Sequence, residues 1–173
     1  GNHAIGVALS AHRLGCQAIV VMPQTAPAVK VEAVERWGAE VRLVGDSFDG
    51  AAEYALALSR DEGKALIPPF DDPEIIAGQG TAGLETMEQC ESLGLTPDQV
   101  LINCSGGGLT AGFAVAVNAL ASDAGIYPVE PEDFDDTRRS IRSGNMEVND
   151  PDARTICDAL MSSPPGDVTF AIN

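Results

Sequence analysis

The sequence predicts an α/β fold in which twisted parallel sheets carry helices on both faces. Short apolar runs rich in β-branched residues alternate with stretches of helical periodicity about four times along the chain, which is the pattern of parallel strands joined by crossover helices. Glycine is abundant, with 18 residues, whereas aromatic residues make up only 5% of the chain. This composition suits tight strand-to-helix turns better than an aromatic-rich β sandwich.

The individual elements follow from the period of the apolar residues. Strands are expected at 18–23, 40–45, 65–70, 99–104 and 124–130, and helices at 4–14, 26–37, 47–60, 73–93, 109–120 and, after an acidic turn, through Arg142. Gly15 is placed to end the first helix and Ser47 to cap the third. Beyond Asn145 the chain is rich in loops and prolines, and its last residues, 169–173, are expected to form a strand or the approach to one.

The division into domains is predicted from the chain length and from one loop. A chain of 173 residues is long enough for one domain or two small ones. Two successive prolines in the loop at 68–72 mark the best boundary, so we expect a small α/β domain at 1–70 and part of a larger one, with a glycine-rich turn, at 71–173. Gly1 opens directly into a helix without an initiator Met, and we expect the fold to be incomplete at both ends.

The chain is strongly acidic, with 26 acidic residues, 10 basic residues and a net charge of −16. Such a surface repels phosphate backbones, so nucleic-acid binding is not expected, and the simplest interpretation is a solvated acidic surface. The sequence shows no signal-like segment and no membrane-length apolar run, so no membrane association is expected. Cys16, Cys90, Cys104 and Cys157 have neither CxxC nor zinc-type spacing, which predicts free, mostly buried thiols in a cytoplasmic protein.

The first candidate site is the SGGGL motif at 105–109, which follows a predicted strand and opens a helix. Consecutive glycines let the backbone bend so that several N–H groups point at one anion, and the helix adds its positive end. A phosphate is the natural ligand, although a tight turn without a ligand would have the same sequence. The motif is neither GxGxxG nor GxxxxGK[ST], which gives a dinucleotide site or a P-loop little support.

The second candidate site is the GNHA motif at 1–4, at another predicted helix start. Asn2 offers an amide donor and acceptor, and His3 offers an imidazole that can pair with an anion. The alternative is that Asn2 only caps the helix.

The third candidate site is the acidic segment at 130–136, which follows the carboxyl end of a predicted strand. Open α/β sheets bind their ligands at that edge. Glu130 and Asp136, with a backbone carbonyl between them, could provide hard oxygen ligands for Mg²⁺ or Ca²⁺. The alternative is an acidic first turn of the next helix, which the helix dipole favours.

Three glycines, Gly78, Gly80 and Gly83, lie within the helix expected at 73–93. Each costs helix stability relative to alanine, so close packing is the expected reason for their presence. We assign them no direct chemistry.

Taken in order, the motifs of this chain resemble those of the threonine dehydratase and serine racemase family, which uses pyridoxal phosphate (PLP). The resemblance covers essentially the whole chain and is specific in order and spacing; its motifs are GNHAIGVA, GAEVRLVG, IAGQGTAGLE, CSGGGLTAG, VEPEDFDD, and TICDAL followed by SSPPGDVTF. It implies PLP fold type II, similar to the tryptophan synthase β subunit, with the domain at 1–70 facing the cofactor.

The resemblance also implies roles for the candidate residues. Asn2 would contact the PLP ring hydroxyl and would lie with His3 beside the substrate carboxylate. The PLP phosphate would be held at Ser105, Gly106, Gly107, Gly108 and Leu109, where Ser105 replaces the first of the family's usual four glycines. The divalent metal would be held by Glu130, Asp136 and the backbone carbonyl of Phe134.

The implied activity is that of an ammonia-lyase that converts L-threonine or L-serine into a 2-oxo acid and ammonia. An amino-acid racemase of the same family, for example a serine racemase, is one alternative, because the two scaffolds are too similar to be separated on this stretch. A non-catalytic module that binds phosphate or PLP is another. Family members are often dimers or tetramers, so we expect a homo-oligomer that acts on small amino acids.

The chain also departs from the family pattern. The Schiff-base lysine of the family precedes the GNHA motif, and the two lysines here, Lys30 and Lys64, do not fit its motif. Ala159 stands where the family usually has a glycine. We therefore expect a partial chain that contains no catalytic residue and is inactive by itself.

Overall fold

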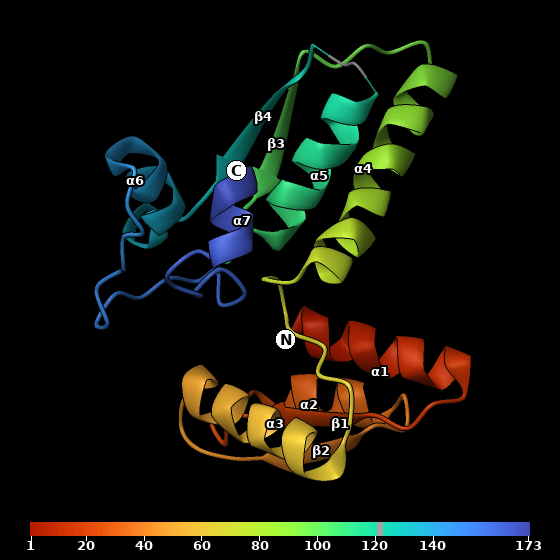
Figure 1. Cartoon of the computed structure of the whole chain (residues 1–173), viewed down its shortest axis with the longest axis vertical. Helices are drawn as coiled ribbons and strands as arrows, with labels where there is room; N and C mark the ends of the chain where they lie inside the picture. Colours follow the sequence, from red (N-terminus) through yellow and green to blue (C-terminus); the bar gives the residue numbers. More distant parts are fainter. Residues whose placement is uncertain (121–122) are drawn as a thin grey trace. The chain divides into compact units, whose positions relative to one another are not determined.

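The computed structural model, which describes residues 1–120 and 123–173, divides into two units, Gly1–Ile67 and Pro68–Asn173. The boundary expected between residues 70 and 71 lies a few residues beyond this division. Each unit contains one two-stranded parallel sheet with helices packed against it (Figure 1). The predicted α/β class with parallel strands is confirmed, although each sheet has only two strands.

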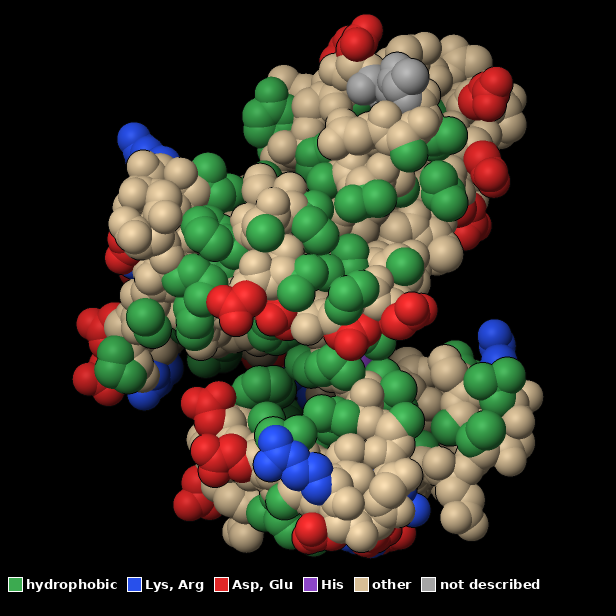
Figure 2. Space-filling model, in the orientation of Figure 1, with side chains coloured by type: hydrophobic (Ala, Val, Ile, Leu, Met, Phe, Trp, Pro, Cys, Tyr) green, Lys and Arg blue, Asp and Glu red, His purple; other side chains and the backbone are tan. Residues whose placement is uncertain are grey.

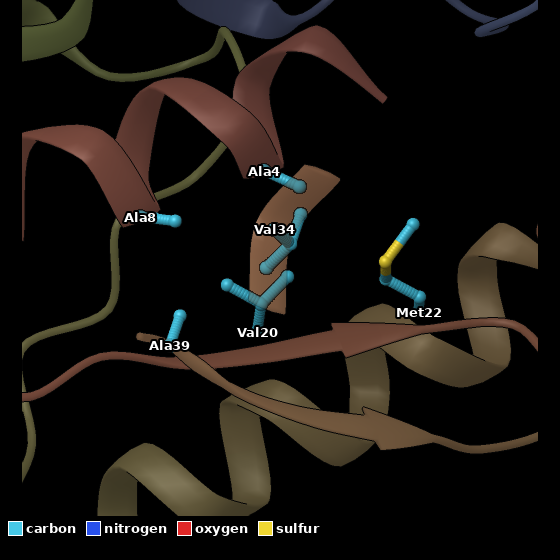
Figure 3. Packing of buried hydrophobic residues seen from close by; sticks show 6 residues of the cluster. All are labelled: Ala4, Ala8, Val20, Met22, Val34 and Ala39. Atoms are coloured by element: carbon cyan, nitrogen blue, oxygen red, sulfur yellow. The ribbon is translucent and has the colours of Figure 1, made fainter. Parts of the chain in front are cut away.

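The first unit alternates helices and strands. Its elements are α1 (Asn2–Leu14), β1 (Ile19–Met22), α2 (Ala28–Glu35), β2 (Glu40–Leu43) and α3 (Phe48–Glu62). The strands β1 and β2 pair in parallel, from Ile19 opposite Glu40 to Met22 opposite Leu43. Helices α1 and α2 cover one face of this sheet and α3 covers the other, as Figure 3 shows. The unit is therefore a three-layer α/β/α arrangement.

A small apolar core fills the space between α1, α2 and the sheet. Its buried members are Ala4, Ala8, Val20, Met22, Val34 and Ala39 (Figure 3). Val20 and Met22 are the two buried positions of β1 and alternate with less buried ones, as the side-chain period of two requires. The two alanines of α1 allow its backbone to approach the sheet closely. Val34 of α2 is fully buried in this core, and burial of such a side chain stabilises the fold by about 1.5–3 kcal/mol.

The predicted helix ends of the first unit are confirmed at two positions. Gly15 ends α1 in the left-handed conformation, with φ 66°, which costs glycine no Cβ clash. Ser47 caps α3, because its Oγ accepts a hydrogen bond of 3.2 Å from the amide of Gly50. Both signals are local in sequence, which is why they could be recognised without a structure.

The second unit is built around a β3–α5–β4 crossover. Its elements are α4 (Pro73–Ser92), β3 (Gln99–Asn103), α5 (Gly108–Ala119), β4 (Gly125–Val129), a 3₁₀ turn η1 (Glu132–Phe134), α6 (Asp136–Ser143) and α7 (Asp167–Ile172). The strands β3 and β4 pair in parallel, from Gln99 opposite Gly125 to Asn103 opposite Val129. Helix α5 packs against both strands, and α4 packs against α5 (Figure 1).

One face of the β3–β4 sheet is covered and the other is not. Ile102 is 4% exposed, whereas its neighbour Leu101 is 70% exposed, so these two side chains lie on opposite faces. Tyr127, opposite Leu101, and Val129 are each 47% exposed. Since α5 packs on the face of Ile102, the apolar side chains of Leu101, Tyr127 and Val129 line the face that α5 leaves open.

Glycines bring α4 and α5 into close contact. A Cβ on Gly80 would lie 3.1 Å from the carbonyl oxygen of Gly112, and one on Gly83 would lie 3.0 Å from the Cβ of Ala116. The packing role expected for these two glycines is thus confirmed. The same expectation is wrong for Gly78, because a Cβ there would meet no atom within 4 Å.

Two sequence-based expectations about secondary structure are wrong. Residues 65–70 form no strand, because Pro68 and Pro69 lack the amide that a ladder needs. Residues 169–173 lie largely in the helix α7. The carboxylate of Asp71 accepts hydrogen bonds from the first amides of that helix, and such a long-range cap leaves no local sequence signal.

The surface and the cysteines complete the description. Figure 2 shows Asp and Glu side chains spread over both units with few Lys or Arg between them. Within residues 1–120 and 123–173, no helix is both long and apolar enough to cross a bilayer. The four cysteines are free, but Cys16 and Cys157 are exposed and only Cys104 is fully buried, so the expectation of mostly buried thiols is wrong.

Replacing glycines of the α4–α5 contact provides a stability test. A Cβ on Gly112 would lie 2.6 Å from the amide nitrogen of Gly80 and 2.7 Å from the carbonyl oxygen of Ile76. Because backbone atoms cannot give way, we expect Gly112→Ala to lower the free energy of unfolding by about 1–3 kcal/mol. The matched Gly78→Ala change, in open space, should raise it by up to about 1 kcal/mol. Urea unfolding measures both, and equal effects would contradict the described contact.

Candidate functional site

The turn that joins β3 to α5 contains the three consecutive glycines of the SGGGL motif. Gly107 adopts φ 90° and ψ −6° and is the N-cap residue of α5. This conformation is open to glycine and strained for other residues. The turn lies at the carboxyl end of β3, which is the edge where parallel sheets bind their ligands.

Thr169, in α7, and Asn173, directly after it, hydrogen-bond to carbonyl groups of this turn. The hydroxyl of Thr169 donates to the carbonyl oxygen of Gly106 at 2.6 Å, and the amide Nδ2 of Asn173 donates to that of Gly107 at 3.2 Å. In a trans peptide, a C=O and the N–H that follows it point in opposite directions. The amides of Gly107 and Gly108 are therefore directed away from Thr169 and Asn173.

The start of α5 supplies further donors. Because the helix begins at Gly108, the amides of Gly108, Leu109 and Thr110 have no carbonyl partner inside it. The helix dipole places positive partial charge at the same end. Together with the directed glycine amides, this end of α5 has the chemistry of an anion cradle.

Packing leaves no room for a side chain at any of the three glycines, and backbone conformation adds a requirement for glycine at Gly107. A Cβ on Gly106 would lie 2.5 Å from the ring of Phe70, and one on Gly108 would lie 2.9 Å from the Cβ of Phe70. A Cβ on Gly107 would lie 2.7 Å from Nδ2 of Asn173. Phe70 and Asn173 thus close the turn from the protein side, and both were missed by the sequence reasoning.

Ser105 connects the turn to the loop that precedes α7. Its Oγ accepts a hydrogen bond of 3.0 Å from the amide of Ser162. A hydroxyl has one hydrogen and two lone pairs, so Ser105 can accept this bond and still donate to an anion. The structure therefore gives Ser105 a second role, since it holds the loop before α7 as well as standing first in the turn.

Cys104, directly before the turn, is buried beside α6. Its Sγ lies 3.6 Å from the hydroxyl of Thr137 and 3.6 Å from the carbonyl oxygen of Ser105. Burial raises the pKa of the Cys104 thiol, so the neutral form is favoured. This residue contributes packing and a weak donor rather than a nucleophile.

The acidic segment forms the entry to α6. The two carboxylate oxygens of Glu130 accept hydrogen bonds from the amides of Thr137, at 3.0 Å, and Arg138, at 2.9 Å. Glu130 therefore stabilises the start of α6, as the alternative interpretation of this segment expected. The hydroxyl of Thr137 also reaches the carbonyl oxygen of Ser105 at 3.5 Å, which links this segment to the glycine turn.

Asp136 is buried in the same region, with 1% of its side chain exposed. Its Oδ1 accepts a hydrogen bond of 2.8 Å from Asn149, whereas its Oδ2 has no hydrogen-bond partner among the described residues. Burial raises the pKa of Asp136. The buried residue Phe134 ends the 3₁₀ turn η1. The three residues expected to bind a metal thus lie between the end of β4 and the first residue of α6, and their joint role stays a prediction.

His3 and Asn2 lie at the start of α1, in the first unit. His3 Nε2 lies 2.9 Å from the carbonyl oxygen of Ile67, which can only accept, so Nε2 carries the hydrogen. Burial lowers the pKa of His3, and the neutral ring then offers Nδ1 as an acceptor.

Asn2 is exposed and is not the helix cap, because Gly1 holds that position. The capping interpretation of Asn2 is therefore wrong, and its role towards a ligand stays a prediction.

Comparison with known proteins matches residues 1–173 to the family described as pyridoxal-phosphate dependent enzymes. The chain belongs to this family. It is 41% identical over 173 residues to the biosynthetic chloroplastic threonine dehydratase of Arabidopsis thaliana, covering 100% of this chain and 28% of that relative. The resemblance to threonine dehydratases is thereby confirmed.

Solved structures of the same family share the fold. The T.th. threonine deaminase superposes with a TM-score of 0.93 at 44% identity, over 99% of this chain and 55% of that one. The maize serine racemase superposes with a TM-score of 0.90 at 34% identity, over 99% of this chain and 50% of that one. The chain thus spans about half the length of these two proteins and less of the plant dehydratase.

The pH dependence of stability tests the buried state of Asp136. A carboxyl whose pKa is raised by folding adds stability below its unfolded pKa of about 3.9, and this contribution is lost as the pH rises through the folded value. We therefore expect Asp136→Asn to become progressively more stable relative to the wild type as the pH rises from about 4 to 7. Urea unfolding across this range measures the difference. Asp133→Asn, at an exposed carboxyl of the same turn, is the control, and parallel pH curves for the wild type and Asp136→Asn would contradict the burial.

Proposed function

We propose that the protein containing this chain is a PLP-dependent ammonia-lyase that converts L-threonine or L-serine into a 2-oxo acid and ammonia. The observation that carries the proposal is the glycine turn, whose amides are directed towards one site while its carbonyls are held by Thr169 and Asn173. The named activity of the Arabidopsis relative, which matches the full chain at 41% identity, supports threonine as the substrate. Since this chain covers 28% of that relative, the activity belongs to a longer polypeptide.

The glycine turn fits the phosphate of PLP. Ser105, Gly106, Gly107, Gly108 and Leu109 would hold it through main-chain amides and the Ser105 hydroxyl. The three glycines carry no side chains, so the backbone of the turn can approach an anion closely. Bound PLP supplies an electron sink for negative charge at the substrate Cα.

Asn2 and His3 are proposed to contact the cofactor ring and the substrate carboxylate, as the family resemblance implies. An amide such as that of Asn2 can hydrogen-bond a ring hydroxyl as donor or acceptor. His3 holds its Nε2 hydrogen on Ile67, so it can donate to a substrate carboxylate only when Nδ1 is also protonated. The assignment of His3 therefore implies a proton on Nδ1 when substrate binds.

Neither lysine of this chain is assigned to covalent catalysis. That role requires a lysine amine at the cofactor. Lys30 lies in α2, and Nζ of Lys64 lies 3.4 Å from a carboxylate oxygen of Glu62. The family resemblance places the lysine ahead of the GNHA motif, so residues 1–173 would bind and orient without forming the covalent link.

A racemase is the second candidate, supported by the superposition on maize serine racemase at a TM-score of 0.90. Elimination removes the β-hydroxyl after the Cα proton has left, whereas racemisation returns a proton to the opposite face. The two activities therefore share the binding residues described above.

Assembly of identical copies and a cytoplasmic location are further proposals, which gel filtration and cell fractionation would test.

We also propose that Glu130, Asp136 and the carbonyl of Phe134 bind Mg²⁺ or Ca²⁺. The partnerless Oδ2 of buried Asp136 supports this, because a cation would satisfy an oxygen that is otherwise costly to bury. Each oxygen of Glu130 accepts one amide and has a further lone pair for a cation. Carboxylate and carbonyl oxygens are the ligands that both ions prefer.

Cation titration tests the metal site. Ca²⁺ or Mg²⁺ should raise the thermal midpoint of this chain, because an ion that binds only the folded state stabilises it. The increase should disappear in Asp136→Asn and persist in the exposed-site control Asp133→Asn. The same increase in both variants would refute the assigned ligands.

Activity assays test the proposed reaction. Residues 1–173 alone should release no 2-oxobutyrate from L-threonine, because no lysine of this chain is assigned to the covalent step. A longer protein that includes the lysine ahead of the GNHA motif should release it continuously. Chiral analysis of serine after incubation with that longer protein separates a lyase from a racemase. Sustained turnover by residues 1–173 alone would refute the assignment of the lysine.

A further inference from the structure

Two adjacent carboxylates, Asp71 and Asp72, stabilise the starts of two different helices. Asp72 is the N-cap residue of its own helix, α4, where its Oδ1 accepts hydrogen bonds from the amides of Glu74, at 2.9 Å, and Ile75, at 3.2 Å. Asp71 instead acts on α7, which lies almost a hundred residues away in sequence. The pair therefore allows one capping carboxylate to be compared with another.

The contacts of Asp71 cover the whole first turn of α7. Its Oδ2 accepts from the amide of Asp167 at 3.1 Å, and its Oδ1 accepts from the amides of Val168, at 2.8 Å, and Thr169, at 3.2 Å. A helix start leaves four amides without partners, and Asp71 satisfies three of them. Since α7 has six residues, it is too short to be stable by its own hydrogen bonds.

The approach of Asp71 to α7 is close. A Cβ on Gly166, the N-cap residue of α7, would overlap the carboxylate of Asp71. The amide of Gly166 also donates to the carbonyl oxygen of Gly106 at 3.3 Å. The start of α7 is thus held between Asp71 on one side and the glycine turn on the other.

The position of α7 in turn determines the glycine turn. Thr169 is fully buried, and its hydroxyl is 2.6 Å from the carbonyl oxygen of Gly106. Asn173, which follows α7, donates to the carbonyl oxygen of Gly107. Loss of the α7 cap would release the carbonyl of Gly106 and allow the peptide plane between Gly106 and Gly107 to rotate. The carbonyl of Gly107 would keep its hydrogen bond of 2.9 Å from the amide of Ala111 in α5.

We propose that Asp71 is a positioning residue for the anion-binding turn. It acts through α7, whose Thr169 holds the carbonyl of Gly106 and thereby directs the amide of Gly107. This inference rests on the proposed function, because it takes the phosphate of PLP as the anion at the turn.

The test compares Asp71→Ala with Asp72→Ala in residues 1–173. Inorganic phosphate and PLP are titrated by calorimetry, and the glycine amide signals are followed by NMR. Asp71→Ala should weaken binding by about tenfold, because the binding-competent turn is then populated for only a fraction of the time. Asp72→Ala also removes a helix cap but should leave binding within about twofold, because it caps only α4.

Two further variants separate positioning from general loss of stability. Asp71→Asn should weaken binding less than Asp71→Ala does, because the one amide oxygen of Asn can still accept from Val168 and Thr169 while the bond from Asp167 is lost. Thr169→Val removes the bond to Gly106 with little change in shape and should weaken binding even if Asp71→Ala does not fold. The inference is overturned if folded Asp71→Ala binds as tightly as the wild type, or if Asp71→Ala and Asp72→Ala weaken binding equally. It is also overturned if Thr169→Val binds with unchanged affinity.

The wild-type titration separates this inference from the proposed function. If neither phosphate nor PLP produces heat or shifts the amides of Gly106, Gly107 and Gly108 in the wild type, the anion site itself is refuted. If the wild type binds and the Asp71 variants behave as the Asp72 variant does, only the positioning role is refuted.

Discussion

The orientation of the peptide planes at Gly106 and Gly107 decides what the carboxyl end of β3 can bind. A peptide presents its carbonyl on one side and the next amide on the other. Here the carbonyls are held by Thr169 and Asn173, so the donors face the opposite side. The proposed cofactor site therefore depends on side chains that would not touch the cofactor.

Close contact between α4 and α5 makes this arrangement possible. Gly80 and Gly112 let the two helix backbones meet almost directly. The start of α4 is thereby brought beside the start of α5, and Phe70 and Asp71, which precede α4, reach the glycine turn and α7. Gly80 and Gly83 of α4, to which no chemistry was assigned from the sequence, therefore influence the site through helix packing.

Local features of the fold could be predicted from the sequence, and long-range ones could not. Gly15 and Ser47 could be recognised as helix ends from their residue type and from the apolar periodicity of the neighbouring residues. The run at 65–70 has the apolar composition of a strand but no neighbouring strand to pair with, and composition alone does not show that. The helix α7 was missed because its cap, Asp71, is far away in sequence.

The same distinction applies to the candidate site. Ser105, Gly106, Gly107, Gly108 and Leu109 were recognised because consecutive glycines between a strand and a helix have one main physical use. Of the supporting residues, Phe70, Asp71 and Asn173 belong to none of the motifs quoted above, and Thr169 lies in the SSPPGDVTF motif without a role having been expected for it. Their importance arises from the contacts they make, which only the folded chain reveals.

The open face of the β3–β4 sheet has a practical consequence for work on this chain. Leu101, Tyr127 and Val129 present apolar surface to water on the side away from α5, whereas parallel sheets are usually covered on both faces. In concentrated solution such surfaces adhere to one another. Copies of residues 1–173 can therefore associate through this face, and a fused solubility partner would shield these three side chains.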